Sequence, residues 1–94
     1  MRLRWTKRAE RDLDEIAAYI GIDSPPAAAR VILELIEQTE ALSIQPAIGR
    51  PGRVAGTREF IMAGLPYILP YRVRGSDVEI LRVLHTSRRW PEDI

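Results

Sequence analysis

The sequence predicts an α+β fold in which a hairpin of two helices packs on one face of a mostly antiparallel sheet, in the order β-α-α-β-β-β. The chain has 94 residues, which suits one domain over residues 1–94, because two domains would each be too small to bury a core. Apolar residues recur at helical spacing between residues 9 and 42, and three stretches rich in strand-forming residues follow, separated by turns. Such elements enclose a single core between the helices and the sheet.

Patterns at the start of the chain predict a first strand and a first helix. Residues 2–5 alternate polar and apolar side chains, as a short strand does, and Thr6 is placed to cap a helix. An apolar stripe follows at helical spacing, formed by Ala9, Leu13, Ile16, Ala17 and Ile20. Charged residues largely fill the other face of this helix, namely Arg8, Arg11, Asp12, Asp14 and Glu15.

A second helix is predicted from about residue 25 to residue 42. Ser24 followed by Pro25 is a strong start signal, since serine caps helices and proline favours the first helical position. The end of the helix is expected at Gln45-Pro46. The link between the two helices is short, so they should pack antiparallel. The apolar stripe of this helix consists of Ala28, Ile32, Leu35, Ile36 and Leu42.

The second half of the chain reads as a turn-rich loop over residues 49–56 and then three strands. These strands are expected at residues 57–62, 67–74 and 78–85. Pro70 lies in the middle strand and lacks an amide donor, so we expect a bulge or irregular pairing there. The remaining residues, 86–94, are expected to fold back over the sheet.

The composition limits the classes of protein that the chain can represent. There is no cysteine and only one histidine, so neither a disulfide framework nor a metal site is expected, and no cofactor is predicted. No apolar run approaches the roughly 20 residues of a membrane helix, and charged residues follow the start at once, unlike a signal peptide. The expected protein is cytoplasmic, without a membrane partner.

Charge is unevenly distributed along the chain, although the net charge is only +1. Residues 1–49 hold six Arg and Lys against eight Asp and Glu, whereas residues 50–94 hold eight Arg against five Asp and Glu. The second half therefore contains the surface better suited to a polyanion or an acidic partner.

Taken together, the order of elements and several short motifs resemble the ParE/RelE superfamily of bacterial type II toxins over nearly the whole chain. The motifs are Trp5-Thr6, Asp12-Leu13 with Ile16, Ser24-Pro25, Pro46, Gly49-Arg50-Pro51-Gly52-Arg53, Gly56-Thr57-Arg58-Glu59, Pro66-Tyr67-Ile68, Tyr71-Arg72-Val73 and Val78-Glu79-Ile80-Leu81-Arg82-Val83-Leu84-His85. Each motif is weak by itself, but their order and spacing are specific.

The resemblance implies a growth-inhibiting toxin that a cognate antitoxin keeps silent. In this superfamily the antitoxin usually joins a DNA-binding domain to a flexible segment that wraps the toxin, so operator DNA is contacted only through the antitoxin. An antitoxin segment with acidic and apolar residues is expected to lie across the helical hairpin and cover the basic face of the sheet. The superfamily has two modes of action, which imply different roles for the same residues.

RelE-like members cleave messenger RNA on the ribosome. This chemistry needs a base, an acid and a cation near the phosphate, and the candidates are His85 as the catalytic group with Arg82 and Arg89. Two features disfavour this mode of action. Where the RelE-type pattern has an arginine the chain has Ile68, and residues 86–94 lack the tyrosine that often accompanies the catalytic group.

ParE-like members bind DNA gyrase and trap it on cleaved DNA, without a catalytic site of their own. The stretch of residues 78–85, ending in Leu-His, and the apolar residue at position 68 look closer to this branch, which we favour. In a binding protein the arginines would contact an acidic or nucleic-acid surface, and Trp90 would be an interface anchor. The candidate contact residues are Arg50, Arg53, Arg58, Arg72, Arg88 and Trp90.

Structural roles compete with each of these assignments. His85 is equally consistent with a hydrogen-bonding residue at a strand end, and Arg50 and Arg53 with solvation of a loop. Arg58 and Arg72 could pair with Glu59, Glu79 or helix acids. Trp5 is expected in the core, together with at least one of Tyr67 and Tyr71, which share a face of their strand. An inactive toxin fold that only binds an antitoxin is a further alternative.

Overall fold

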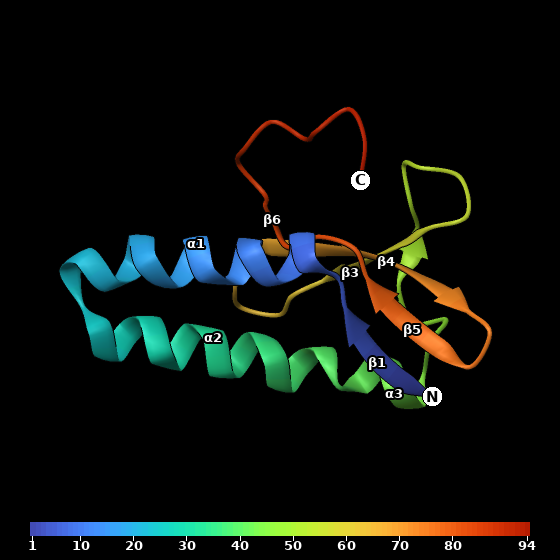
Figure 1. Ribbon diagram of the computed structural model, residues 1–94, viewed down its shortest axis with the longest axis horizontal. Helices are drawn as coiled ribbons and strands as arrows, with labels where there is room; N and C mark the ends of the chain where they lie inside the picture. Colours follow the sequence, from blue (N-terminus) through green and yellow to red (C-terminus); the bar gives the residue numbers. More distant parts are fainter.

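The computed structural model describes residues 1–94, and the α+β architecture is confirmed. Figure 1 shows two long antiparallel helices packed beside a twisted sheet, with the far end of the hairpin projecting beyond it. The elements are β1 (Arg2–Trp5), α1 (Lys7–Asp23), α2 (Pro25–Thr39), α3 (Ala41–Ile44), β2 (Arg50–Pro51), β3 (Arg58–Ile61), β4 (Tyr67–Arg74), β5 (Asp77–Ile80) and β6 (Leu84–His85). No helix is long and apolar enough to cross a membrane.

Both helices begin where the capping residues predict. The hydroxyl of Thr6 accepts a hydrogen bond from the Ala9 amide, and the hydroxyl of Ser24 accepts one from the Ala27 amide. The second helix ends earlier than predicted, at Thr39. The Thr39 hydroxyl donates to the Leu35 carbonyl at 2.7 Å, competing with the regular backbone pattern. A short helix, α3, follows and places Leu42 in the core.

The sheet is mixed but mostly antiparallel, with the strand order β1-β5-β4-β3-β2. Only β1 and β5 run parallel to each other. The short strand β2 was not predicted, because glycine and proline suggested a loop at residues 49–56. It forms because Arg50 and Pro51 pair with Glu59 and Arg58 of β3.

The last predicted strand, residues 78–85, is in fact two strands separated by a bulge. β5 pairs with β4 as far as Ile80 opposite Tyr71, and β6 resumes with Leu84 opposite Ile68. Three residues, 81–83, thus lie opposite two residues of β4. One of those two is Pro70, so irregular pairing at this proline is confirmed.

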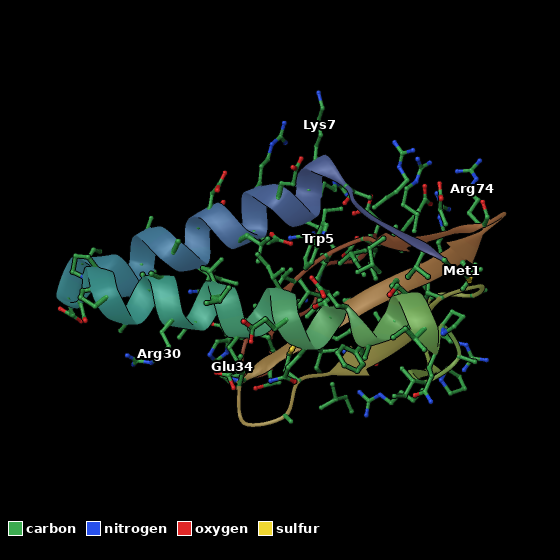
Figure 2. All side chains as sticks on the ribbon, turned by 90° about the horizontal axis from the view of Figure 1, so that it is seen from below. Met1, Trp5, Lys7, Arg30, Glu34 and Arg74 are labelled. Atoms are coloured by element: carbon green, nitrogen blue, oxygen red, sulfur yellow. The ribbon has the colours of Figure 1, made fainter.

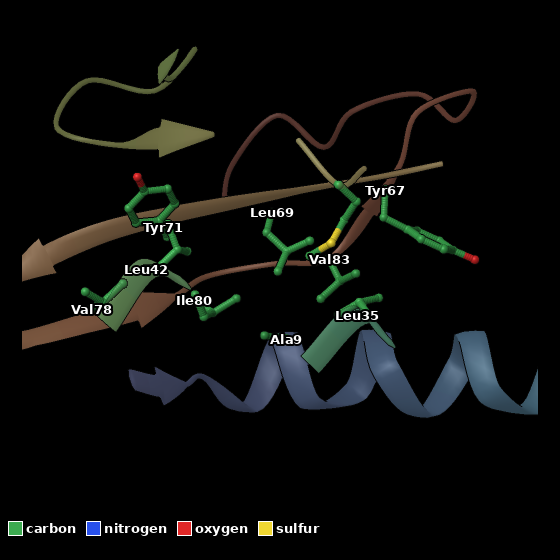
Figure 3. Close-up of a cluster of buried hydrophobic side chains, with 10 residues drawn as sticks. Ala9, Leu35, Leu42, Tyr67, Leu69, Tyr71, Val78, Ile80 and Val83 are labelled. Carbon is green, nitrogen blue, oxygen red and sulfur yellow. The ribbon is translucent and has the colours of Figure 1, made fainter. Parts of the chain in front are cut away.

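The core lies between the helices and one face of the sheet (Figure 3). Tyr67 and Tyr71 are both buried, and Trp5 packs against the same cluster, as predicted. Figure 2 shows Trp5 beneath the first turns of α1, whereas Lys7 points away from the protein. The buried cluster consists of Ala9, Leu35, Leu42, Met62, Tyr67, Leu69, Tyr71, Val78, Ile80 and Val83.

Residues 86–94 do not cross the sheet as expected. Figure 1 shows this segment looping out from β6 beside the start of α1. Its last residues approach Arg8, which donates to the Ile94 carbonyl at 3.0 Å and lies 3.8 Å from the Asp93 carboxylate. The segment therefore stands beside α1 and leaves a depression between them.

Candidate functional site

The depression between α1 and residues 82–91 is a cleft of about 510 Å³. It brings together four residues that the sequence singled out, which are His85, Arg82, Arg88 and Arg89. Apolar side chains also line it, including Ile16 and Ile20 of α1, Tyr67 of β4, and Val83 and Leu84 near β6. A cleft that combines apolar walls with a few charged groups is the usual form of a binding site.

Asp12 lines the cleft and connects helix α1 to the bulge between β5 and β6. Its carboxylate accepts two hydrogen bonds from Arg82, to Nε at 2.8 Å and to one terminal nitrogen at 3.1 Å, and a third from the Val83 amide at 2.9 Å. Asp12 is only 8% exposed, so its predicted position on the outer face of the helix is wrong. The third bond takes the Val83 amide, which explains why the strand is interrupted here.

Arg82 is held in place by this carboxylate. The hydrogen bonds to Asp12 raise the pKa of Arg82, against the lowering effect of partial burial, and the charges of Asp12, Glu15 and Asp93 raise it further. Its side chain is 21% exposed. The guanidinium is therefore a permanent cation whose Nε and one terminal nitrogen are already bound within the protein.

His85 lies at the end of β6, partly buried, with its ring edge-on to Tyr67 at a centroid distance of 5.5 Å. Its Nδ1 accepts a hydrogen bond from the Ser87 amide at 3.1 Å and lies 2.7 Å from the Ser87 hydroxyl. A nitrogen that accepts from an amide carries no proton, so the neutral ring has its proton on Nε2. In this state Nε2 can donate a hydrogen bond but cannot take up a proton.

Tyr67 contributes a buried phenol beside His85. Burial raises the pKa of Tyr67 above its ordinary value, and the nearby charge of Arg88 acts in the opposite direction. The phenol therefore stays protonated at neutral pH and cannot replace the ring as a base.

Arg88 and Arg89 differ from the other arginines of the cleft. Both are exposed, and neither side chain forms a hydrogen bond or an ion pair within the protein. The adjoining polar depression, of about 220 Å³, is lined by Arg8, Arg11, Asp12, Glu15 and Arg82. Arg88 and Arg89 are thus the cations of the cleft that are available to a partner.

Trp90 and the β2–β3 loop form a separate group next to the cleft. The Arg53 guanidinium lies 3.9 Å from the centroid of the Trp90 ring. Arg50 pairs with Glu59, with its Nε at 3.1 Å and a terminal nitrogen at 3.0 Å from one carboxylate oxygen. The Arg53 amide donates to the other oxygen at 2.9 Å. These contacts give Arg50 and Arg53 structural partners.

Arg58 and Arg72 are not part of the cleft. Arg58 lies opposite Tyr71 in the ladder and donates to the Gly49 carbonyl at 2.8 Å, so it does not pair with an acid, an alternative that the sequence left open. Arg72 pairs with Glu79 at 2.6 Å, as predicted, on the face of the sheet away from the helices. The two side chains point to opposite faces, and the structure does not gather them around His85.

Sequence reasoning missed Asp12 and Glu59 as important residues. Asp12 lies three residues after Ala9 and four before Ile16, which places it on the buried face of the helix. That spacing was the signal that could have found it. Nothing in the sequence pattern indicates that Glu59 is buried, because its burial depends on the pairing of β2 with β3. No group of three metal-ligating side chains is present.

Comparison with known proteins gives a consistent result. The profile of the family described as "ParE toxin of type II toxin-antitoxin system, parDE" matches residues 3–90. The "Putative toxin Y4kP" of Sinorhizobium fredii is 54% identical over 91 residues, which cover 97% of this chain and 94% of that protein. The "Toxin RelE2" of Caulobacter vibrioides is 39% identical over 84 residues, covering 89% and 93% respectively.

A solved structure agrees with these matches. A chain of the "Chromosomal ParDE TA system from P. aeruginosa" superposes with a TM-score of 0.84 at 32% sequence identity. The superposition covers 93% of this chain and 97% of the other. At this level of identity and coverage the likeness extends through the helical hairpin and the sheet.

Proposed function

The chain belongs to the ParE toxin family of type II toxin–antitoxin systems, and we propose that it acts by binding DNA gyrase and trapping it on cleaved DNA. This action takes place in the cytoplasm, where gyrase works. A cognate antitoxin partner follows from the family. The identity of the target is inferred from the geometry of the cleft.

One observation carries the proposal: two of the three groups proposed for a ribonuclease, His85 and Arg82, are already bound within the protein, and only Arg89 is free. Arg82, which lies three residues before His85, is bound by Asp12, and Nδ1 of His85 is bound by Ser87. With its proton on Nε2, the neutral ring cannot activate a ribose hydroxyl through that atom. The cleft is better suited to binding a partner than to acid–base chemistry.

Ile68 supports the same conclusion. RelE-like toxins have an arginine at this position. Here the isoleucine is 8% exposed and lies opposite Ile61 and Leu84 in the neighbouring strands. An arginine there would bring a charge into an apolar neighbourhood. The buried position matches the apolar residue of the ParE-like branch.

Ribosome-dependent cleavage of messenger RNA is the second candidate, and one comparison favours it. A relative that is 39% identical carries the name "Toxin RelE2". If this chain acts similarly, His85 is the catalytic group and Arg88 and Arg89 are the free cations beside it. Binding of substrate would then have to break the hydrogen bond between His85 and Ser87.

The outer end of the helical hairpin is the proposed place for the antitoxin. Tyr19 and Ile22 lie one turn apart on α1, and they are exposed although apolar, as is Leu33 on α2. Exposed apolar residues on a projecting hairpin suit a long-lived protein partner. Tyr19 also lines the cleft, so a segment covering it would obstruct the cleft directly.

Two parallel assays test the target. Purified toxin is titrated into gyrase supercoiling with detection of cleaved-DNA complexes, and into ribosomes translating a defined message. We expect trapped gyrase–DNA complexes and intact message. The variant His85→Ala should still trap gyrase, because its ring lines the cleft but is not a reacting group.

The opposite result is equally clear. Cut message with unaffected gyrase, abolished by His85→Ala, would establish the ribonuclease and refute the proposal. A toxin inactive in both assays that still forms a complex with its antitoxin would identify an inactive binding module.

A further inference from the structure

We propose that the cleft between α1 and residues 82–91 is the surface that binds the target protein, and that it accepts one acidic segment carrying apolar side chains. The inference rests on the proposed function, because it assigns a binding site for the protein that the toxin poisons. The cleft shares Tyr19 with the proposed antitoxin surface on the hairpin, but its arginines lie outside that surface.

The arginines of the cleft differ in whether they are free to bind a partner. Among the cations that line the cleft, Arg82 is bound to Asp12, whereas Arg88 and Arg89 have no partner within the protein. A guanidinium that is free and exposed can form paired hydrogen bonds with a carboxylate. The bound partner should therefore present carboxylates where Arg88 and Arg89 stand.

The lining of the cleft is also partly apolar. Ile16 and Ile20 of α1 face the same space as Tyr67 and Leu84. Apolar side chains of a partner that displace water from these walls would gain free energy in proportion to the area buried. An interface of this kind has an apolar centre and a charged rim.

Electrostatics favours protein over nucleic acid in the cleft. Glu15, which has no ion pair, lines the same walls as the arginines, and its negative charge opposes a chain of phosphates. Trp90 is the aromatic residue best suited to stack on a base, but the guanidinium of Arg53 covers one face of its ring. A peptide segment can place its carboxylates at two positions and avoid Glu15, whereas a phosphate backbone carries charge at every step.

The difference between the hairpin surface and the cleft also favours the target, rather than the antitoxin, as the partner that binds in the cleft. The helical hairpin exposes apolar side chains, with Ile22 80% and Leu33 58% exposed, which suits a partner that stays bound. The cleft has free cations at its rim, which accelerate encounter through long-range attraction. A toxin released from its antitoxin must find its target by diffusion, and the cationic cleft serves that step.

A charge-matched pair of variants tests the assignment. Arg88→Ala/Arg89→Ala removes two charges from the cleft, and the control Arg30→Ala/Arg74→Ala removes two exposed charges without ion pairs elsewhere. Figure 2 shows Arg30 and Arg74 at opposite ends of the molecule, pointing outward. Circular dichroism and thermal unfolding verify that both full-length variants are folded.

Binding to purified gyrase without DNA is measured by surface plasmon resonance at two salt concentrations. We expect Arg88→Ala/Arg89→Ala to bind about tenfold more weakly or worse, with a smaller salt dependence. The control should match wild type, and Glu15→Gln should bind about twofold more tightly, because it removes repulsion of an acidic segment. Binding of the co-expressed cognate antitoxin should survive in all variants.

The outcomes separate this inference from the proposed function. If wild-type toxin traps gyrase and Arg88→Ala/Arg89→Ala does so equally well, the inference is wrong and the function stands. If wild-type toxin neither binds nor traps gyrase, both are wrong. Loss of binding to a DNA duplex with unchanged binding to gyrase alone would make nucleic acid the occupant, and loss of antitoxin binding would make it the antitoxin.

Discussion

Two carboxylates of this protein have the same local chemistry and different surroundings. Asp12 and Glu59 are both buried, and each accepts hydrogen bonds from one arginine and one backbone amide. Asp12 connects α1 to the bulge that borders the cleft, whereas Glu59 connects β3 to the β2–β3 loop. The arginine that pairs with Asp12 is 21% exposed, and the one that pairs with Glu59 is 50% exposed.

The difference in exposure decides what each pair contributes. A carboxylate whose partner is mostly buried cannot be removed without leaving a cation away from water, whereas an exposed partner is rehydrated. The comparison also corrects the interpretation of the arginine-rich half of the chain. Arg50, Arg58, Arg72 and Arg82 are bound within the protein, so the basic residues available to a partner are far fewer than the sequence suggests.

The largest effect is expected for Asp12→Ala. It leaves Arg82 without its partner and the Val83 amide without its acceptor, which should lower the free energy of unfolding by about 3 to 5 kcal/mol. Urea denaturation measures the loss. Target binding should fall as well, because the bulge no longer holds the wall of the cleft. A loss below about 1 kcal/mol would mean that the pair behaves as a surface pair.

A smaller effect, of about 2 kcal/mol, is expected for Glu59→Ala. The variant loses the hydrogen bonds to Arg50 and to the Arg53 amide, but the guanidinium of Arg50 can turn to water. The same urea experiment applies, with Glu59→Gln as the variant that keeps the volume. Since Glu59 lies outside the cleft, folded variant protein should bind the target like wild type, and a specific loss of binding would contradict the comparison.

Each region also contains a buried tyrosine, which makes stability depend on pH. Tyr67 lies by the cleft, while the Tyr71 hydroxyl accepts from the Gly49 amide and donates to the Pro46 carbonyl, both at 2.8 Å. Burial raises the pKa of both phenols above 10.0. The hydrogen bond from the Gly49 amide and the charge of Arg58 partly lower the pKa of Tyr71, and the charge of Arg88 partly lowers the pKa of Tyr67.

The sign of the effect follows from these directions. Above pH 10 the unfolded phenols lose protons that the folded ones retain, so the free energy of unfolding falls as pH rises through the folded pKa values. Below pH 10 this contribution is fully present. Thermal unfolding between pH 8 and 12 checks it, and Tyr67→Phe and Tyr71→Phe should each make the fall shallower. An unchanged slope in Tyr71→Phe would show that its phenol titrates normally.

The smallest effect is expected for Arg53→Ala, which removes the cation above Trp90. Exposed contacts of this kind contribute about 0.5 to 1 kcal/mol, so the unfolding midpoint should hardly move. Acrylamide quenching of Trp90 fluorescence, measured in a Trp5→Phe background, should increase because the ring face becomes accessible. Unchanged quenching would mean that the ring is covered by other residues.

Helix starts, the order of elements and the family could be predicted from the sequence because they depend on local signals. Thr6 and Ser24 cap helices by bonding to amides three residues ahead, and apolar periodicity depends on neighbours along the same element. The irregular pairing at Pro70 was likewise predictable, since a missing amide is a property of the residue itself.

The candidate site was predicted in part. His85, Arg82, Arg88 and Arg89 were named from the sequence and lie in one cleft, because they follow one another along the chain. Which of them is free was not predictable: Arg82 is bound by Asp12, seventy residues away in sequence. Arg58 and Arg72 were named as contact residues together with Arg88, but the alternation of β3 and β4 directs them to opposite faces.

The sequence by itself thus determined the fold class, the family and the residues from which a site could be made. The tertiary structure alone decided which arginines are used inside the protein, where the last strand is interrupted and where a cleft remains. The physical reason is range. Caps, turns and periodicity act within a few residues, whereas a charge is bound or left free according to the acids that distant segments bring to it.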